Sequence, residues 1–256
     1  MLNRTLLFGE GLFETWRVYK GRKLPLVEDH LARMEKGCQF FGWPFAKEKA
    51  KALLEKTLKE IPVETEARLR LTLVTYGKER VEYTNFLTTW QPLSPDLSRL
   101  QKEGVKIAIA PWPRCSSPLR DFKTTCFLEN NLMLNRARGK GFYEVLCLNE
   151  RGEITEGCIS NIFFIKDEHT IITPSKKAGL LPGITRQKII EILQQRGIKV
   201  EEMPIYPEEI NQFQGAFLTN AVIEVLPIKQ IEDTVYSCPN GCEWLKSAYR
   251  SLILSG

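Results

Sequence analysis

Histidine is scarce in this sequence. Only two of the 256 residues are histidine, His30 and His169. Histidine is the most frequent general base of enzymes near neutral pH and the commonest metal ligand. This scarcity excludes a site built on several histidines. An acid–base enzyme of this composition must therefore move protons with another side chain.

Long apolar segments are missing as well. No apolar run approaches the roughly 18 residues of a membrane-spanning helix, and no signal of charged and then apolar residues opens the sequence. The seven cysteines are an odd number at low density, which is typical of reduced thiols in the cytosol. We therefore expect a cytoplasmic protein without a membrane partner.

The closest cysteine pair, Cys238 and Cys242, has a spacing that half of a zinc site could have. A second pair is missing from the sequence, and structural zinc sites need four ligands. We therefore expect no metal. The excess of five positive charges is spread along the chain and does not form a basic tract, so we also expect no nucleic-acid partner.

The familiar short motifs of nucleotide binding and hydrolysis are absent. The sequence has no Gly-x-Gly-x-x-Gly, no His-Glu-x-x-His and no Gly-x-Ser-x-Gly. Gly152 and Gly157 have the glycine spacing of a P-loop, but Cys158 and Ile159 follow where lysine and serine or threonine are needed. Phosphate binding by a P-loop is therefore excluded.

The first part of the chain has the pattern of helices packed on an antiparallel sheet. Val27, Leu31, Met34, Cys38 and Phe41 recur at steps of three and four and predict an amphipathic helix that ends near Gly42. A second helix is expected at 46–60. Alternating apolar and polar residues predict strands at 12–19, 68–73, 82–90 and 105–110.

A proline-rich segment separates this part from the rest. Residues 111–118 contain three prolines, which do not support a regular element. We therefore expect an N-terminal lobe at 1–110, a connector at 111–120 and a larger C-terminal lobe at 121–256. In the second lobe the pattern predicts helices at 125–138, 185–196 and 243–254, and strands at 142–149, 158–166, 198–203 and 215–228. The predicted class is α+β with two lobes.

A lysine is the best candidate to replace histidine. Lys123 follows the connector, and pockets tend to form where two lobes meet. A desolvated lysine loses its charge readily and can form a Schiff base. Taken alone, however, a lysine is more often a surface residue.

Three other segments contain groups that could complete such a site. The Pro-Gly turn before the helix at 185–196 directs the N–H groups of Ile184 and Thr185, and the Thr185 hydroxyl, towards one spot, as in an anion site or a simple helix cap. Glu156 precedes an apolar strand and could meet a buried cationic nitrogen, or could be a solvated turn residue. Arg33 follows His30 on the predicted helix and could take part in such a site, or could form a salt bridge at the surface.

Six segments, in this order, resemble the fold-type IV pyridoxal-phosphate enzymes. This class-IV aminotransferase group includes branched-chain aminotransferases, D-amino-acid aminotransferases and 4-amino-4-deoxychorismate lyase. The resemblance covers nearly the whole chain and implies two α+β lobes, a cofactor at their junction, and a homodimer. The matching segments are Gly9–Thr15, His30–Arg33, Phe122–Thr124, Glu156–Phe163, Leu181–Arg186 and Thr219–Pro227.

The resemblance assigns roles to individual residues. It implies that Lys123 carries pyridoxal 5′-phosphate as a Schiff base and then shuttles the substrate proton. It implies that Glu156 keeps the pyridine nitrogen protonated, so that the ring can accept electrons, with Asn161 behind it. The implied phosphate-binding residues are Arg33, Gly183, Ile184, Thr185, Asn220 and Ala221.

The resemblance leaves the reaction on the small-molecule amine substrate open. Leu128 stands five residues after Lys123, where branched-chain aminotransferases usually have tyrosine, and the run from Lys123 to Glu129 is more similar to the lyase pattern. We therefore expect the lyase reaction of folate biosynthesis, which converts 4-amino-4-deoxychorismate to 4-aminobenzoate and pyruvate. The alternatives are a branched-chain or D-amino-acid aminotransferase that uses 2-oxoglutarate, and a relative without catalytic activity.

Two further residues are candidates for substrate binding. Phe13 is expected to line the ring pocket, and Arg70 to bind a substrate carboxylate through charge-assisted hydrogen bonds. Arg68 lies on the same face of its strand and is equally placed by the alternation. Family members usually have a strand pair before the first matching segment, whereas eight residues precede Gly9 here, so either the pair is missing or the sequence starts late. If the strands are missing, we expect an open edge in the first sheet.

Overall fold

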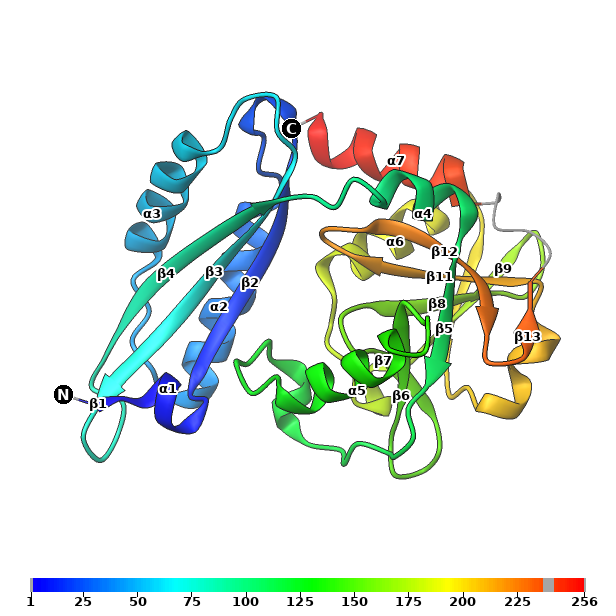
Figure 1. Cartoon of the computed structure of the whole chain (residues 1–256), viewed down its shortest axis with the longest axis horizontal. Helices are drawn as coiled ribbons and strands as arrows, with labels where there is room; N and C mark the ends of the chain where they lie inside the picture. The colour runs from blue at the N-terminus through cyan, green and yellow to red at the C-terminus, as the bar shows by residue number, and fades with distance from the viewer. Residues whose placement is uncertain (1, 237–241, 256) are drawn as a thin grey trace. The chain divides into compact units, whose positions relative to one another are not determined.

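The computed structural model of the chain describes residues 2–236 and 242–255, which form two compact units. Unit 1 comprises residues 2–94 and 122–127. Unit 2 comprises residues 95–121, 128–236 and 242–255. Each unit contains both helices and strands (Figure 1). This arrangement agrees with the predicted α+β class.

Unit 1 is built on an antiparallel sheet in which β3 is central. Its strands are β1 (Leu2–Asn3), β2 (Gly11–Val18), β3 (Ala67–Gly77) and β4 (Tyr83–Pro92). β3 pairs with each of the other three. Its helical segments are α1 (Arg4–Phe8), η1 (Lys20–Arg22), α2 (Val27–Phe41) and α3 (Lys47–Glu60). Among the described residues β4 pairs only with β3, so it forms one edge of the sheet.

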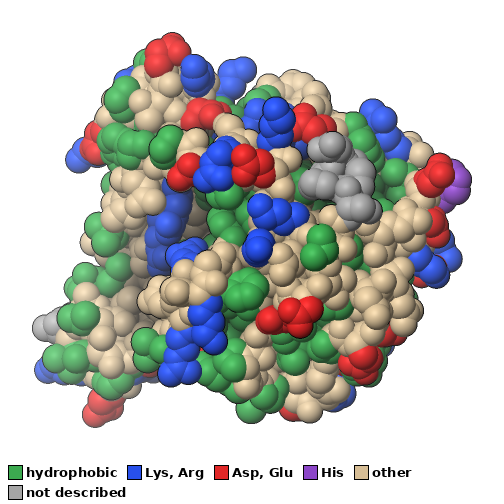
Figure 2. Space-filling view, turned by 45° about the vertical axis from the view of Figure 1, so that its right-hand side comes forward, with side chains coloured by type: hydrophobic (Ala, Val, Ile, Leu, Met, Phe, Trp, Pro, Cys, Tyr) green, Lys and Arg blue, Asp and Glu red, His purple; other side chains and the backbone are tan. Residues whose placement is uncertain are grey.

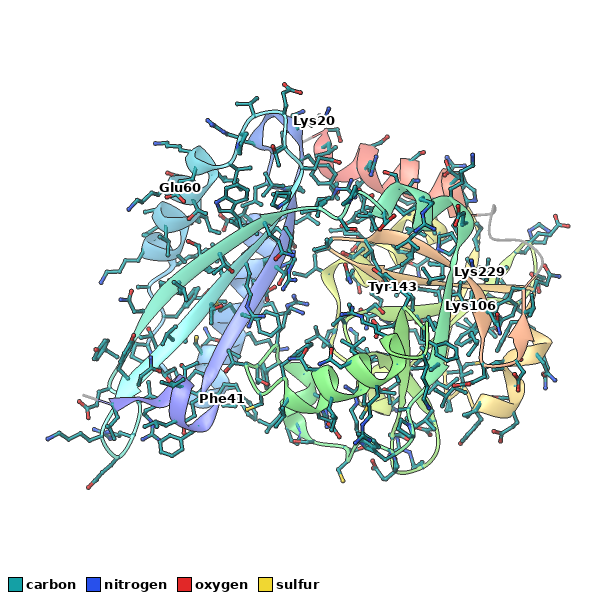
Figure 3. The ribbon with its side chains drawn as sticks, viewed as in Figure 1. Lys20, Phe41, Glu60, Lys106, Tyr143 and Lys229 are labelled. Atoms are coloured by element: carbon teal, nitrogen blue, oxygen red, sulfur yellow. The ribbon has the colours of Figure 1, made fainter. Side chains whose placement is uncertain are left out.

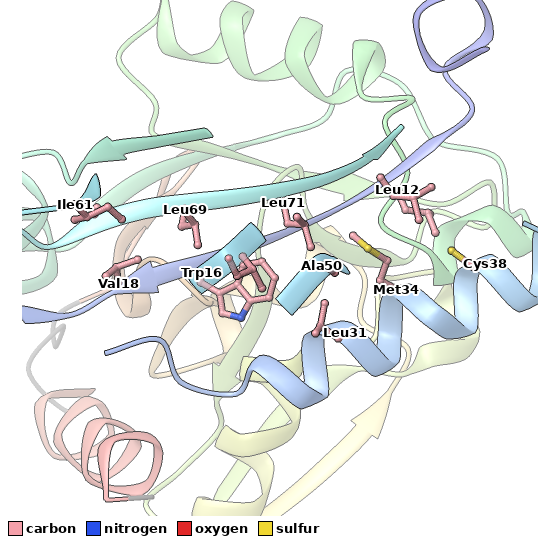
Figure 4. Close-up of a cluster of buried hydrophobic side chains, with 13 residues drawn as sticks. Leu12, Trp16, Val18, Leu31, Met34, Cys38, Ala50, Ile61, Leu69 and Leu71 are labelled. Atoms are coloured by element: carbon pink, nitrogen blue, oxygen red, sulfur yellow. The ribbon is translucent and has the colours of Figure 1, made fainter. Parts of the chain in front are cut away.

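The core of unit 1 forms where the alternating apolar residues of β3 meet the apolar face of the helix α2. β3 alternates buried and half-buried residues along its whole length, because successive side chains of a strand point to opposite faces. Its buried side chains Leu69 and Leu71 pack with Trp16 of β2 and with Leu31 and Met34 of α2 (Figure 4). The predicted helix at 27–42 is confirmed, and α2 ends where Gly42 adopts a left-handed conformation.

Unit 2 contains a larger mixed sheet. Its strands are β5 (Val105–Ile109), β6 (Glu144–Leu148), β7 (Ile154–Gly157), β8 (Asn161–Ile165), β9 (Thr170–Pro174), β10 (Lys199–Met203), β11 (Gly215–Asn220), β12 (Glu224–Ile231) and β13 (Thr234–Val235). They lie in the order β10-β9-β8-β11-β12-β5-β6-β7, with β13 beside β12. Lys106 and Lys229, labelled in Figure 3, lie on the neighbouring strands β5 and β12.

The helical segments of unit 2 connect these strands. They are α4 (Leu97–Glu103), η2 (Pro118–Asp121), α5 (Leu128–Arg138), η3 (Lys176–Ala178), α6 (Ile184–Gln195), η4 (Pro207–Gln212) and α7 (Glu243–Leu254). The predicted helices at 185–196 and 243–254 are confirmed by α6 and α7. α6 begins at the predicted Pro-Gly turn, with Gly183 as its N-cap residue.

Two predicted elements differ from the structure. The single strand expected at 215–228 is a hairpin of β11 and β12, because the Asn220 side chain accepts hydrogen bonds from the N–H groups of Val222 and Ile223 and closes a turn. The helix expected from residue 125 begins at Leu128, because the residues before it pair with β2 of unit 1.

The structure also groups residues differently from the lobes expected at 1–110 and 121–256. Residues 95–110 belong to unit 2, because β5 is hydrogen-bonded between β12 and β6. Residues 122–127 belong to unit 1. The proline-rich segment lies within unit 2, and Arg114 in its middle forms a bridge with Asn149.

No helix of residues 2–236 and 242–255 has the length and apolar character needed to cross a membrane. In the same residues, no group of three or more His, Cys, Asp and Glu is placed to hold a metal ion. Cys238 of the cysteine pair considered above lies outside the described residues. On the face shown in Figure 2, Lys and Arg side chains are interspersed with Asp, Glu and hydrophobic groups.

Candidate active site

Lys123 is held by backbone hydrogen bonds to β2. The Phe13 N–H donates to the Lys123 carbonyl oxygen at 2.9 Å, and the Thr125 N–H donates to the Gly11 carbonyl oxygen at 2.9 Å. Leu12 and Thr124 form the β-bridge between these two bonds. The lysine is therefore fixed along the edge of a strand and is not on a free loop.

A glycine in the first matching segment permits this approach. A Cβ atom at Gly11 would lie 2.9 Å from the Thr125 hydroxyl oxygen and 2.9 Å from the Leu73 carbonyl oxygen. Both distances are too short for a carbon atom, so any larger residue would displace the segment that carries Lys123. The Thr125 hydroxyl also donates to the Gly9 carbonyl oxygen at 2.6 Å.

Aromatic packing fixes the other end of this segment. The Phe122 ring lies 4.6 Å from Phe40 and 5.2 Å from Phe41, the last residue of α2 (labelled in Figure 3). Phe41 in turn stacks on Trp43 at 4.6 Å. Lys123 therefore lies between a backbone pairing on one side and an aromatic cluster on the other.

Two cationic groups lie against the ring of Phe13. The Arg70 guanidinium carbon is 3.6 Å and the Lys123 Nζ atom 4.6 Å from the ring centroid. Phe127 contacts the same ring edge-on at 5.8 Å. The three predicted residues Phe13, Arg70 and Lys123 are thus brought together in unit 1. Two positive groups on one ring favour binding of an anion.

Arg70 has the properties of an anion-binding residue. Its Nε atom donates to the Thr72 hydroxyl at 3.2 Å, and no carboxylate of the described residues pairs with it. Burial, together with the neighbouring Arg68, lowers the pKa of Arg70 to about 10, so the guanidinium stays charged at neutral pH. A half-buried charge of this kind gains from a bound carboxylate.

Arg33 is held by a buried carboxylate. Its Nε and Nη2 atoms donate to Glu14 at 2.8 and 2.6 Å, and His30 Nδ1 lies 2.7 Å from the same carboxylate. Burial raises the pKa of Glu14, but the charge of Arg33 and the hydrogen bonds from Arg33 and His30 outweigh it and lower that pKa to about 2. Burial lowers the pKa of His30, so we infer a neutral ring that donates from Nδ1.

Glu14, which holds Arg33, was not among the site residues predicted from the sequence. It lies on β2 between Leu12 and Trp16, the positions that face the core, and it is 1% exposed. A charged residue at a core-facing position of a strand was the available signal, because such a charge needs a buried partner. A small cavity beside it is lined by Glu14, Arg33, Phe122 and Lys123, among others.

In unit 2, both carboxylate oxygens of Glu156 accept hydrogen bonds. Arg114 Nη2 donates to Oε1 at 3.1 Å, and the Leu181 N–H donates to Oε2 at 3.0 Å. Asn161 Nδ2 approaches Oε2 at 3.4 Å. Glu156 is therefore a fixed carboxylate on β7 and not a solvated turn residue. The buried Arg114 was missed because the prolines around it indicated only a connector.

The N-terminus of α6 lies next to this carboxylate network. Asn161 Nδ2 also donates to the Leu181 carbonyl oxygen at 3.0 Å, and its Oδ1 fills the space that a Cβ atom at Gly183 would need. Gly183 offers no side chain to cap α6. The first N–H groups of the helix, at Ile184 and Thr185, have no acceptor within the helix. This end of α6 can therefore receive an anion.

The predicted Asn220 and Ala221 lie in the turn between β11 and β12. Both polar atoms of the Asn220 amide bind within the protein, because Nδ2 donates to the Ile159 carbonyl oxygen at 3.0 Å while Oδ1 accepts the two N–H groups that close the turn. Asn220 thus shapes the turn with its side chain, and the Ala221 N–H takes no part in these bonds. At this turn, the backbone, including the Ala221 N–H, remains for a ligand.

A second buried carboxylate supports the loop between Glu156 and Asn161. Glu144 accepts the N–H groups of Cys158 and Ile159 at 3.1 and 3.2 Å and the Ser160 hydroxyl at 3.0 Å. Burial raises its pKa to about 7. Cys158 Sγ lies 3.6 Å from Cys147 Sγ, and both thiols are buried.

Comparison with known proteins identifies the family. Residues 11–231 match the family described as Amino-transferase class IV. The chain is 31% identical over 252 residues to the aminodeoxychorismate lyase of Bacillus subtilis (strain 168), which covers 92% of this chain and 82% of that protein. It is 28% identical over 265 residues to a probable branched-chain-amino-acid aminotransferase of Rickettsia conorii, with 99% and 90% covered.

A solved structure shows the same fold. The branched-chain aminotransferase of Thermoproteus uzoniensis superposes with a TM-score of 0.87 at 24% identity, over 99% of this chain and 88% of that chain. The chain therefore belongs to the class IV amino-transferase family, and the resemblance and the fold class expected from the sequence are both confirmed.

Pyridoxal 5′-phosphate, which we expected from the resemblance, is the cofactor of this family, and each unit by itself contains groups of the chemistry that this cofactor needs. Lys123 offers an amine for the aldehyde of the cofactor. Glu156 offers a fixed carboxylate for a protonated pyridine nitrogen. The uncapped N-terminus of α6, with the Thr185 hydroxyl, offers donors for the phosphate.

The Glu14 cluster gives a testable pH dependence. Because folding lowers the pKa of Glu14 from 4.5 to about 2, its contribution to stability is present above pH 4.5 and is lost as the pH falls towards 2. The shift corresponds to about 3 kcal/mol. We expect wild type to lose this free energy of unfolding between pH 4.5 and 2, and Glu14→Gln to be less stable at pH 7 and to lose less.

Urea titrations at several pH values, followed by tryptophan fluorescence, measure this difference. Glu10→Gln is the matched control, because Glu10 also pairs with an arginine, Arg4, but is 32% exposed. Exposed pairs contribute about 1 kcal/mol or less. Equal acid sensitivity of wild type and Glu14→Gln would contradict the assigned role of Glu14.

Proposed function

We propose that this protein is a pyridoxal-phosphate-dependent lyase that converts 4-amino-4-deoxychorismate to 4-aminobenzoate and pyruvate, a step of folate biosynthesis. The similarity to the Bacillus subtilis lyase supports this choice. We further propose that the protein acts in the cytoplasm as a homodimer.

The central group of the proposed reaction is the Lys123 amine. Bound to this lysine, pyridoxal 5′-phosphate supplies an electron sink for the charge that develops when a C–H bond next to the substrate amine breaks. The Nζ atom of Lys123 takes that proton and later returns a proton to the product side. Its position against the Phe13 ring, 4.6 Å from the centroid, limits where the proton can be delivered.

Glu156 is proposed to hold the proton of the pyridine nitrogen. The Arg114 guanidinium, 3.1 Å away, stabilises the negative charge of this carboxylate. The Leu181 N–H fixes its second oxygen. The arrangement therefore keeps a negative charge at one place, which is what a protonated ring nitrogen requires.

The phosphate is proposed to be bound by Arg33, Gly183, Ile184, Thr185, Asn220 and Ala221. Contacts of three of these residues support particular roles within this proposal. Arg33 already donates two hydrogen bonds to Glu14, so its proposed contribution to the phosphate is its positive charge. Gly183 and Asn220 act through the shape of the backbone, as described above.

The substrate is proposed to bind next to Phe13 and Arg70. 4-Amino-4-deoxychorismate has two carboxylates, and the Arg70 guanidinium, which no carboxylate of the described residues neutralises, can bind one of them by charge-assisted hydrogen bonds. The ring of Phe13 lies under the same guanidinium and offers an apolar face. These two residues would therefore orient the substrate.

The observation that carries the lyase over an aminotransferase is Leu128. It begins α5 five residues after Lys123 and is 83% exposed within the described chain. The tyrosine usual in branched-chain aminotransferases would place a phenol there, and Leu128 has no polar group. The aminotransferase remains the second candidate, supported by the similarity to the Rickettsia conorii protein.

Turnover of two substrate classes tests the proposal. With 4-amino-4-deoxychorismate we expect pyruvate and 4-aminobenzoate in equal amounts, and with branched-chain or D-amino acids plus 2-oxoglutarate we expect little glutamate. Lys123→Ala should abolish the reaction, whereas the exposed Lys140→Ala should keep it. Glutamate formation without pyruvate release would replace the lyase with the aminotransferase.

A second prediction concerns the two arginines of β3. Arg70→Gln should lower kcat/KM for 4-amino-4-deoxychorismate about 10- to 100-fold, because a charge-assisted hydrogen bond contributes about 1.5–3 kcal/mol. Arg68→Gln, two residues away on the same face, should change it less than about threefold. Steady-state kinetics on both variants measure this, and equal effects would remove Arg70 from the substrate site.

A further inference from the structure

Two buried hydroxyl groups meet behind the N-terminus of α6. Thr185 Oγ1 and Tyr249 Oη, from α6 and α7, lie 3.2 Å apart. Thr185 is 3% and Tyr249 2% exposed. The two residues belong to the same unit, and each has the other as its hydrogen-bond partner in the described chain.

Within the described residues, this pair of hydroxyl groups has two hydrogens to donate but only one hydrogen bond. Each hydroxyl has one hydrogen to donate, and the single bond between them uses one of the two. If Thr185 donates, the phenol hydrogen of Tyr249 is left buried without an acceptor, which costs about 1–3 kcal/mol. If Tyr249 donates, the Thr185 hydrogen is left at the uncapped first turn of α6, where an anion can accept it.

The phenol of Tyr249 is suited to be the donor. Burial raises its pKa to about 12, with the Thr185 hydrogen bond acting in the opposite direction and Glu224 adding to the rise. The phenol therefore keeps its proton at neutral pH. The hydrogen bond therefore runs from Tyr249 to Thr185 when a further group is present to accept the Thr185 hydrogen.

α7 is anchored firmly enough to fix this geometry. Arg250, the next residue, donates to both oxygens of the fully buried Glu224 at 2.8–3.0 Å. Glu224 begins β12 directly after the turn of Asn220 and Ala221, and it has a left-handed conformation with φ of 58°. One helix thus supports both backbone segments that we assign to the phosphate.

We propose that Tyr249 is a positioning residue for the cofactor phosphate, in which its phenol donates to Thr185 Oγ1 and thereby directs the Thr185 hydrogen to a phosphate oxygen. This inference rests on the phosphate site of the proposed function. It assigns to α7, which none of the matching sequence segments includes, a part in cofactor selectivity that acts through Thr185.

The test compares two ligands that differ only in the phosphate. Apoenzyme is titrated with pyridoxal 5′-phosphate and with pyridoxal, and each Kd is measured from quenching of tryptophan fluorescence. Tyr249→Phe should weaken pyridoxal 5′-phosphate about 3- to 10-fold and leave the Kd of pyridoxal unchanged. Tyr236→Phe is the matched control, because it removes a buried hydroxyl of the same unit that donates to the Ile210 carbonyl oxygen at 2.8 Å.

A second variant tests the pair from its other side. Thr185→Val should weaken pyridoxal 5′-phosphate without weakening pyridoxal, and adding Tyr249→Phe to it should have no further effect. An unchanged Kd of pyridoxal 5′-phosphate in Thr185→Val would overturn the inference even if Tyr249→Phe did not fold.

Two other outcomes separate the inference from the proposed function. Equal weakening of both ligands by Tyr249→Phe would show a general structural role and would overturn the positioning role alone. If wild type bound pyridoxal as tightly as pyridoxal 5′-phosphate, the phosphate site itself would be wrong, and the inference would fail with it.

Discussion

The structure of unit 1 depends on the short backbone pairing between β2 and residues 123–125. Two hydrogen bonds and one bridge join segments that are more than 100 residues apart in sequence. The pairing is possible because Gly11 leaves room for Thr125. It places the Lys123 amine next to the Phe13 ring and the Arg70 guanidinium, so that a binding group and a reactive group share one surface.

Buried carboxylates paired with arginine recur beside the residues assigned to the cofactor. Glu14 fixes Arg33 in unit 1, and in unit 2 Arg114 fixes Glu156 while Arg250 holds Glu224. A buried ion pair adds little net stability, but it is costly to break on one side. Such pairs are therefore suited to sites where the position of a charged group matters more than its contribution to the free energy of unfolding.

Local sequence patterns predicted part of this account. The period of α2, the Pro-Gly start of α6 and the candidate Lys123 follow from residues close in sequence. The structure places Arg70 and Lys123 against the Phe13 ring. The partners of Glu14 and Glu156, the return of residues 122–127 to unit 1 and the hairpin of β11 and β12 were missed. Each depends on contacts between distant segments or on one side chain that closes a turn.

The central claim is that Lys123, among the many lysines of the chain, is the one that holds the cofactor. Reduction of the holoenzyme with borohydride makes the link between pyridoxal 5′-phosphate and its lysine permanent, and peptide mapping by mass spectrometry then finds the modified residue. The account predicts one modified lysine per chain, at Lys123. A modification at another lysine, or none in protein that has bound the cofactor, would contradict it.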